Sequence, residues 1–364
     1  MVTSLVDPED PIMGFTWNWI MKLAERLDRL YVATSRLLIT RGLPRNIFFY
    51  QWSGKKQANK HRKGKTSSIK RILSYVYVGF KVGVLAAKLK LRRKIDVVFA
   101  HMNPEFVLVL APLCKLLRLP IALWYLHKKT SLRLVLAYAL SDIVITAHQQ
   151  GFPINGSKVK AIGHGIELKS LPPKIRGENV VLCVGRISRV KRYEEVIKAI
   201  SRLLRKGLNV KLVIAGPVYD EDYYRKLLEL IQSLSLQGKV RFIGPIPHSK
   251  IASLYSSASV LVSCCPAFDK AVLEAMSMGL PVIVGDKLFD EVLGKYRDIC
   301  RYKLGFPESL ANKLEVLLES KELREKVGRE LRLKVLEEHS VNSLTERLVD
   351  VLESLAKPST KILH

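Results

Sequence analysis

The sequence predicts an α/β protein made of two Rossmann-like domains that face each other across a cleft. Short β-branched runs alternate with amphipathic stretches of helical length along nearly the whole chain, which is typical of parallel sheets built from βαβ units. With 364 residues the chain is too long for one ordinary core. The alternation pauses at residues 167–179, where two prolines, a glycine and several charged residues predict a linker.

In the first half, apolar β-branched runs predict strands and apolar residues at helical spacing predict the helices between them. The expected strands are Leu30–Thr34, Ile47–Tyr50, Asp96–His101, Ile121–Tyr125 and Asp142–Ala147. The expected helices are Thr16–Leu27, Ser67–Leu91, Pro104–Leu117 and Thr130–Leu140.

The second half repeats this pattern and then becomes purely helical beyond Asp290. Its expected strands are Val180–Val184, Val210–Ala215, Val240–Ile243, Val260–Ser263 and Val282–Val284. Its expected helices are Tyr193–Lys206, Glu221–Leu234, Ser249–Ala258 and Lys270–Met278. We therefore expect domains at residues 1–170 and 171–340, and a C-terminal helix within 341–364 that packs back on the first domain.

The net charge of +27 is concentrated in the first half, where residues 1–170 hold 28 Lys and Arg against 9 Asp and Glu. Residues 53–95 contain no acidic residue and include the run KKQANKHRKGK at 55–65. Such a surface is attracted to anionic lipid headgroups or to nucleic acid, and it is also compatible with simple solvation. Nucleic acid is the less favoured partner, because this run contains no aromatic residue on which bases would stack.

Other sequence features exclude several protein classes. No stretch of 18 uninterrupted apolar residues and no signal peptide is recognisable. The five cysteines lack metal-ligand spacing, so we expect reduced, buried thiols, no metal, and a cytoplasmic protein, peripheral on the inner face of the membrane if it binds lipid. Neither G-x-G-x-x-G nor a Walker A motif is present, nor H-E-x-x-H or G-x-S-x-G.

Two motifs carry candidate chemistry. The strand Val181–Val184 runs into a turn that contains Gly185, Arg186 and Lys191. The second motif, DKAVLEAMSMGLP at 269–281, predicts a short helix with an acidic N-cap and a buried Glu274. Two cations beside a helix N-terminus hold a diphosphate without a metal.

Each of these features also has a simpler explanation. The cations fit a surface turn, Asp269 fits a plain N-cap, and Glu274 fits an ion pair with Lys270 one turn earlier.

Together with LVIAGP at 212–217 and VRFIGPIP at 240–247, the two motifs resemble retaining glycosyltransferase family 4 (glycosyl transferases group 1), which has the GT-B fold. The resemblance covers nearly the whole chain and is strongest at residues 180–285. It implies a metal-independent enzyme that moves a sugar from a UDP- or GDP-linked donor to a hydroxyl acceptor with retention and needs no cofactor. VDPEDPIMGF at 6–15 resembles the glycine loop of the family, after a shortened first strand.

The resemblance implies a role for each matching residue. In the family, the cations bind the diphosphate, the Glu that matches Glu274 binds the ribose, and the loop at 244–247 lies against the base. The expected donor-binding residues are Gly14, Gly185, Arg186, Lys191, Pro245, Ile246, Phe268, Ala271 and Glu274. The expected catalytic residues are His127, Asp269 and Lys270, with His101 on the acceptor side and His164 near the hinge.

One position departs from the family pattern E-x7-E, because Pro266 stands where the first glutamate is expected. The nearest acid is Asp269. Because Arg186, Lys191 and Glu274 are all retained, we favour a subfamily with a different donor-sugar contact over a catalytically silent relative. We expect the acceptor to be a lipid-linked or cell-envelope glycan, as in polysaccharide biosynthesis. The alternatives are another GT-B enzyme (a nucleotide-sugar epimerase or a sugar-phosphate synthase) or a nucleic-acid-binding protein.

Overall fold

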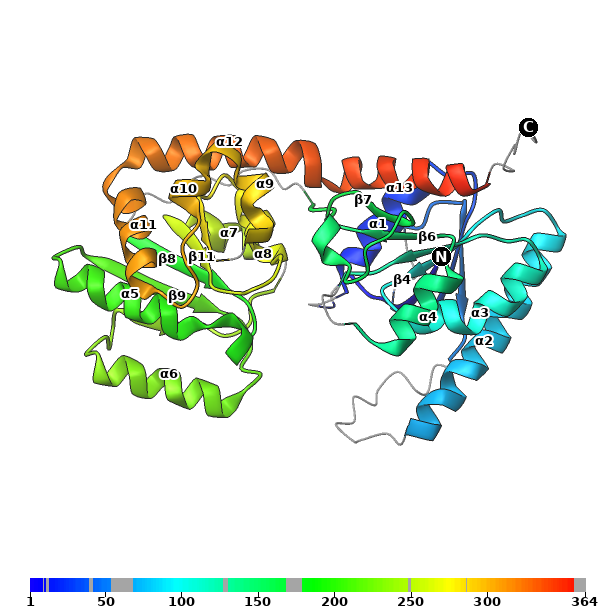
Figure 1. Cartoon of the computed structure of the whole chain (residues 1–364), viewed down its shortest axis with the longest axis horizontal. Coiled ribbons are helices and arrows are strands. Elements are labelled where there is room, and N and C mark those ends of the chain that lie inside the picture. Colours follow the sequence, from blue (N-terminus) through cyan, green and yellow to red (C-terminus); the bar gives the residue numbers. More distant parts are fainter. Residues whose placement is uncertain are drawn as a thin grey trace. The chain divides into compact units, whose positions relative to one another are not determined.

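A computed structural model describes residues 1–8, 10, 13–38, 42–53, 68–126, 130–167, 179–247, 250–285 and 287–356. The chain forms two compact units (Figure 1). Unit 1 comprises Met1–Gly165 together with Val341–His364, and unit 2 comprises Ile166–Ser340. Each unit is an α/β layer structure around its own parallel sheet. Among the residues described, no helix is both long enough and apolar enough to cross a bilayer.

Unit 1 is built on a seven-stranded parallel sheet of order β3-β2-β1-β4-β5-β6-β7. The strands are β1 (Val2–Val6), β2 (Leu30–Leu37), β3 (Ile47–Gln51), β4 (Val98–His101), β5 (Ile121–Trp124), β6 (Ile143–Thr146) and β7 (Val159–Ala161). The five strands predicted for this half are all present. β1 lies inside the sheet, between β2 and β4, and β7 lies at its edge; the residue range of neither was predicted.

Helices cover both faces of this sheet. They are α1 (Phe15–Ala24), α2 (Ser68–Leu91), α3 (Pro104–Leu116), α4 (Leu132–Leu140) and α13 (Val341–Ala356). On one face, α1 and α13 contribute Trp19 and Leu344 to a core cluster; on the other, α2, α3 and α4 contribute Val82, Leu110 and Leu134. The C-terminal helix α13 therefore completes the core of the unit that contains the N-terminus (Figure 1).

Unit 2 is built on a five-stranded parallel sheet of order β10-β9-β8-β11-β12. Its strands are β8 (Asn179–Val184), β9 (Val210–Ala215), β10 (Val240–Phe242), β11 (Val260–Ser263) and β12 (Val282–Val284). Its α-helices are α5 (Tyr193–Arg205), α6 (Glu221–Ser233), α7 (Ile251–Ser256), α8 (Lys270–Ser277), α9 (Asp290–Leu293), α10 (Arg297–Cys300), α11 (Pro307–Glu319) and α12 (Lys321–His339). Every strand and helix predicted for this unit is confirmed, with ends that differ by two residues or fewer.

The order of the strands in unit 2 determines where a ligand site can form. The chain enters the sheet at β8, continues to β9 on one side, and later reaches β11 on the other side. Parallel α/β sheets bind ligands at such a switch point, outside the carboxyl ends of the strands. The turn after β8 and the segment that joins β11 to α8 both leave the sheet at this edge.

Candidate functional site

The turn after β8 is shaped by Gly185. Its φ of +147° is rarely adopted by residues with a side chain, and a Cβ here would lie 2.6 Å from Cε and 2.7 Å from Nζ of Lys191. The Gly185 carbonyl accepts a hydrogen bond of 2.9 Å from the Tyr193 hydroxyl at the start of α5. Glycine is therefore the residue that lets the lysine side chain lie against the strand end.

Lys191, on the short 3-10 helix η3 (Arg189–Lys191), forms an ion pair with Asp269 from the other strand end. The Nζ–Oδ2 distance is 2.6 Å, and only 14% of the Lys191 side chain and 12% of the Asp269 side chain are exposed. The Ser263 hydroxyl, at the end of β11, donates to the same Oδ2 atom at 3.0 Å. Burial disfavours the ammonium form, but the Asp269 carboxylate outweighs it and raises the pKa of Lys191 above its ordinary value. The lysine is therefore a fixed cation at neutral pH.

Asp269 is also the N-cap of α8. Its backbone is extended and its Oδ1 accepts from the Ala271 N–H at 3.4 Å. A helix N-terminus and the Lys191 ammonium therefore converge on the Asp269 side chain, and both of these groups attract anions. In this structure the carboxylate of Asp269 is the anion that contacts both the Lys191 ammonium and the helix N-terminus.

Glu274 lies one turn further along α8 and is less buried than the sequence predicts, with 20% of its side chain exposed. Its Oε1 lies 3.3 Å from Nζ of Lys270, the pairing that the sequence offered as the simpler explanation. Its Oε2 accepts a hydrogen bond of 3.2 Å from the hydroxyl of Tyr255 on α7. Burial and the nearby Glu274 raise the pKa of Tyr255 well above its ordinary value, so the phenol remains a donor. These two contacts fix the carboxylate at the strand-end edge.

Arg186 is exposed beside this cluster. Its guanidinium carbon lies 4.9 Å from the centroid of the Tyr219 ring. The two residues line an open groove of about 490 Å³ with Ser188, Arg189, Val190 and Asp220. The positive charge of Arg186 is close enough to Lys191 to act against the raised pKa of that lysine. Arg186 and Lys191 are therefore within electrostatic range of each other.

The remaining donor-side predictions in unit 2 have mixed outcomes. In the loop after β10, the Gly244 carbonyl accepts a hydrogen bond of 2.8 Å from the Gly216 N–H, while Pro245 is exposed and Ile246 is half-buried, so both can meet a ligand. Phe268 does not fit a donor contact, because its buried ring stacks on Phe289 with centroids 4.4 Å apart.

The predicted site residues of unit 1 also have structural roles. A Cβ on Gly14 would lie 2.7 Å from the carbonyl oxygens of both Pro8 and Asp10, so the loop's own packing requires glycine there. His164 is half-buried, one residue before Gly165, where unit 1 ends. His127 lies outside the described residues.

His101, predicted on the acceptor side, does not fit a ligand contact, because its side chain is fully buried. Its Nδ1 lies 3.2 Å from the Thr3 hydroxyl, and the rings of Phe15 and Trp19 enclose it with centroids 5.8 and 5.3 Å away. Burial lowers its pKa to about 3, so the imidazole stays neutral.

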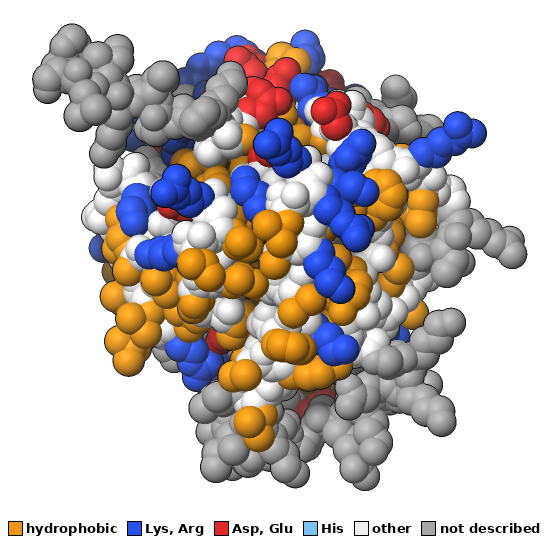
Figure 2. Space-filling model, turned by 90° about the vertical axis from the view of Figure 1, so that its right-hand side faces the viewer, with side chains coloured by type: hydrophobic (Ala, Val, Ile, Leu, Met, Phe, Trp, Pro, Cys, Tyr) orange, Lys and Arg blue, Asp and Glu red, His pale blue; other side chains and the backbone are white. Residues whose placement is uncertain are grey.

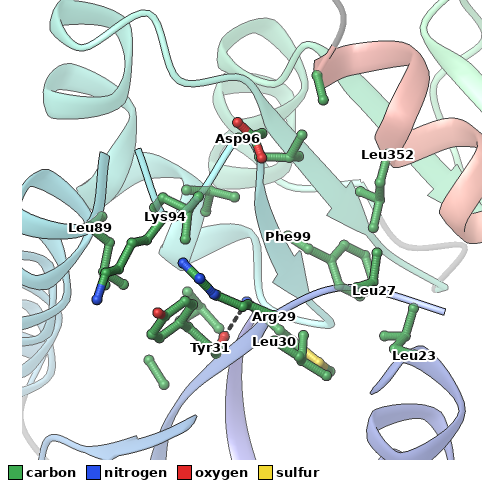
Figure 3. A pocket seen from close by; sticks show the side chains of 18 of the residues that line it. Leu23, Leu27, Arg29, Leu30, Tyr31, Leu89, Lys94, Asp96, Phe99 and Leu352 are labelled. Carbon is green, nitrogen blue, oxygen red and sulfur yellow. Dashed lines mark hydrogen bonds between the residues drawn. The ribbon is translucent and has the colours of Figure 1, made fainter. Parts of the chain in front are cut away.

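A cavity of about 710 Å³ in unit 1 lies away from all of these residues (Figure 3). It is lined by Val2, Leu30 and Val98, which begin β1, β2 and β4, and by the last turns of α1 and α2. Parallel sheets bind ligands at the opposite, carboxyl-end edge. Among the residues described, no group of three or more side chains could hold a metal ion.

Three residues of the site were not predicted, namely Tyr255, Ser263 and Tyr219. Ser263 could have been found from the sequence, because it is the last residue of a predicted strand. Tyr255 and Tyr219 contact the site through the tertiary fold alone.

Part of the chain resembles known glycosyltransferases in sequence. Residues 167–334 match the sequence profile of the family described as Glycosyl transferases group 1. An uncharacterized glycosyltransferase of Methanocaldococcus jannaschii is 32% identical over 178 residues, which cover 48% of this chain and 44% of the relative. The alpha-monoglucosyldiacylglycerol synthase of Streptococcus pneumoniae is 33% identical over 137 residues, covering 34% of this chain and 30% of that protein. The chain thus matches less than two thirds of the length of these relatives.

Solved structures match almost the whole chain at low identity and therefore support the fold alone. Anabaena HepE in complex with UDP and glucose gives a TM-score of 0.71 at 17% identity, covering 97% of this chain and 98% of that one. Sucrose-phosphate synthase from Thermosynechococcus elongatus gives 0.74 at 16% identity, with the same coverage of 97% and 98%. Residues 167–334 therefore match the model of glycosyl transferases group 1, and the chain has the GT-B fold, as its sequence motifs predicted.

Proposed function

We propose that this protein transfers a sugar from a UDP- or GDP-linked donor to a hydroxyl acceptor, with retention of the anomeric configuration and without a metal. The observation that carries the proposal is the convergence of the Lys191 ammonium and the N-terminus of α8 at the adjacent carboxyl ends of β8 and β11. A nucleoside diphosphate gains charge as the glycosidic bond breaks. Fixed cations and a helix N-terminus stabilise that charge more strongly in the transition state than in the bound donor.

We assign a role in donor binding to the two cations, to Glu274 and to the loop at 244–247. Arg186 and Lys191 hold the diphosphate. Glu274, oriented by Lys270 and Tyr255, accepts hydrogen bonds from the ribose hydroxyls. The base lies against the exposed loop at 244–247, through Pro245 and Ile246.

At the reacting end, Lys270 contacts a phosphate oxygen and Asp269 contacts a hydroxyl of the transferred sugar. His127, which lies outside the described residues, keeps the catalytic role that the family resemblance implies. The acceptor hydroxyl attacks the anomeric carbon from the face that the diphosphate leaves. A new carbon–oxygen bond forms as the bond to the β-phosphate oxygen breaks, and a phosphate oxygen takes the proton of the acceptor. This scheme assigns no protein nucleophile.

The acceptor is a lipid-linked or cell-envelope glycan, reached on the inner face of the membrane. Three observations support this: the basic first half, the burial of all five cysteines, which form no disulfide, and the name of the Streptococcus pneumoniae relative, alpha-monoglucosyldiacylglycerol synthase.

The test is a transfer assay with UDP- and GDP-sugars and lipid-linked acceptors, in which the product anomer is read by NMR. We expect nucleoside diphosphate release that depends on acceptor, and a product with the donor's anomeric configuration. Lys191→Ala should abolish it, whereas Lys198→Ala, which removes an exposed lysine of α5, should not. An inverted anomer, or a new sugar formed without acceptor, would exclude a retaining transferase.

A further inference from the structure

Unit 1 exposes a stripe of apolar side chains along α2. The residues concerned are Leu73, Val76, Tyr77, Phe80, Val84 and Leu91. Their exposed fractions run from 39% at Val84 to 77% at Leu91. At 100° per residue all six lie within one third of the helix circumference. Figure 2, which views the side of the chain where α2 and α3 lie in Figure 1, shows apolar side chains gathered among Lys and Arg.

α2 packs against the rest of unit 1 through the side opposite to the stripe. The opposite side of the helix buries Val78, Val82 and Ala86. It also carries Gly79, where a Cβ would lie 2.7 Å from the Cβ of Val109 on α3, so the two helices pack at close range. The helix is therefore already anchored to unit 1, and its outer stripe is available for another contact.

Neighbouring helices extend this surface. Leu132, Val135 and Leu136 of α4 are exposed, Leu132 to 75%, and so is Leu116 of α3 to 79%. α3 packs against both α2 and α4, so these side chains belong to one side of unit 1. We call this surface, formed by the stripe of α2 with the exposed apolar residues of α3 and α4, the apolar face. Single exposed apolar residues are common on proteins, but a continuous group of this size marks an interaction surface.

The charges around the apolar face indicate what covers it. Residues 68–141 contain 13 Lys and Arg and only 2 Asp and Glu. Lys81 and Lys88 flank the stripe on α2, and the ammonium of Lys81 lies 5.7 Å from the centroid of the Tyr77 ring. Protein–protein interfaces are depleted of lysine, whereas anionic headgroups attract lysines that border an apolar surface helix.

We infer that the apolar face docks on the surface of an anionic lipid bilayer, with α2 lying along the headgroup plane and its apolar stripe among the upper acyl chains. Such an arrangement needs no membrane-spanning helix, and none is found among the residues described. Docking extends the proposed lipid-linked acceptor, but it is tested separately, because binding to vesicles needs neither donor nor acceptor.

The experiment measures co-sedimentation of the full chain with phosphatidylcholine vesicles, with and without phosphatidylglycerol. We expect binding to the anionic vesicles that weakens at high salt, by roughly fivefold for each cation whose attraction is lost. Val76→Asp with Phe80→Asp should lower the partition at least about tenfold, because two apolar anchors are replaced by charges that the headgroups repel. Both positions are exposed, so an unchanged melting temperature should accompany the loss.

The matched control is Leu228→Asp with Leu333→Asp, which places the same charges at exposed apolar positions of α6 and α12 in unit 2. This variant should bind vesicles like the wild type. Equal partition of the α2 variant and the wild type would overturn the inference. So would a wild-type dimer that the α2 substitutions dissociate while no vesicle binding is seen, since a second copy would then cover the face. A chain that binds vesicles but no nucleotide sugar would instead refute the proposed enzyme and leave the docking surface intact.

Discussion

Replacing Asp269 by Asn removes the negative charge on the predicted phosphate cradle and keeps the shape of the side chain. The Asn amide oxygen can still accept from the Ala271 N–H, and Asn and Asp are equally good N-caps. The NH2 group that replaces Oδ2 is a donor, so the Ser263 hydroxyl must accept from it where it donates in the wild type. The substitution therefore tests the charge of Asp269 separately from the helix start that it stabilises.

The effect on donor binding follows from the position of Lys191 between two anions. A phosphate held by this ammonium brings a second negative charge to about 5 Å from Asp269, and at an effective dielectric constant of about 20 the two repel by about 3 kcal/mol. Partial exposure and the cation of Arg186 reduce this repulsion, and we take about half of it. The remaining 1.4 kcal/mol or so corresponds to about tenfold in Kd. Asp269→Asn should therefore bind free UDP or GDP about tenfold more tightly.

The free energy of unfolding should fall in the same variant, although its affinity for the nucleoside diphosphate rises. Lys191 loses the partner of a largely buried ion pair, which costs about 1 to 3 kcal/mol and lowers the melting temperature of the ligand-free protein by several degrees. Sugar transfer should also fall, because the proposed contact of Asp269 with the sugar is weakened. Isothermal titration of the nucleoside diphosphate and thermal unfolding measure the two effects on the same samples.

Asp222→Asn is the control, since Asp222 lies in the first turn of α6 and forms an exposed ion pair with Arg225. It removes one carboxylate charge that does not line the groove beside Arg186, so diphosphate affinity should stay within about twofold. Unchanged or weaker diphosphate binding by Asp269→Asn would refute the reasoning, because the carboxylate would then not share the lysine with the donor.

Three further predictions concern other residues. His101 has a pKa of about 3 in the fold against 6.5 when unfolded, so stability is lost as the pH falls below 6.5, by up to about 1.4 kcal/mol per pH unit. In His101→Phe this part of the acid dependence should disappear from urea titrations, and an unchanged slope would contradict the burial argument. Glu274→Gln should weaken UDP or GDP binding about tenfold and bring the Kd of the 2′-deoxynucleotide close to that of the ribonucleotide, whereas retained discrimination would place the ribose elsewhere. Gly185→Ala should displace the Lys191 side chain and abolish diphosphate binding. The control Gly207→Ala, also at positive φ but with nothing within 4 Å of the added Cβ, should cost only about 1 kcal/mol of stability. Equal diphosphate binding by both variants would show that the turn does not position the lysine.

The fold was predictable where each element carries its own pattern. The buried strands of unit 2 are apolar runs, and the helices between them repeat apolar residues at helical spacing. β1, in contrast, is VTSLV, with two polar residues at its centre, one of which, Thr3, is fully buried beside His101. β7 has three residues at the sheet edge, too few for any period. Both strands are defined by their neighbours in the sheet.

The sequence predicts which residues carry the charges of the site, but it does not predict every ion pair that they form. Lys270 and Glu274 are one helical turn apart, so their ion pair follows from spacing. Lys191 and Asp269 are 78 residues apart and meet only because β8 and β11 are neighbours in the sheet. His101 ends β4, and strand-end positions are shared by residues that face a ligand and residues that face the core; its burial shows that it faces the core. Phe268 lies in the segment between β11 and α8, and its ring packs into the core in the same way.

The most direct test of the donor site is the thermal unfolding of wild-type, Arg186→Ala and Lys191→Ala proteins across UDP-, GDP- and ADP-sugars. A donor at about 100 times its Kd stabilises the folded state by about 2.7 kcal/mol, which corresponds to a rise of several degrees in melting temperature. We predict this rise for a UDP- or GDP-sugar with the wild type and its loss in both variants. A rise of equal size in Arg186→Ala and Lys191→Ala would contradict the assignment of the donor site.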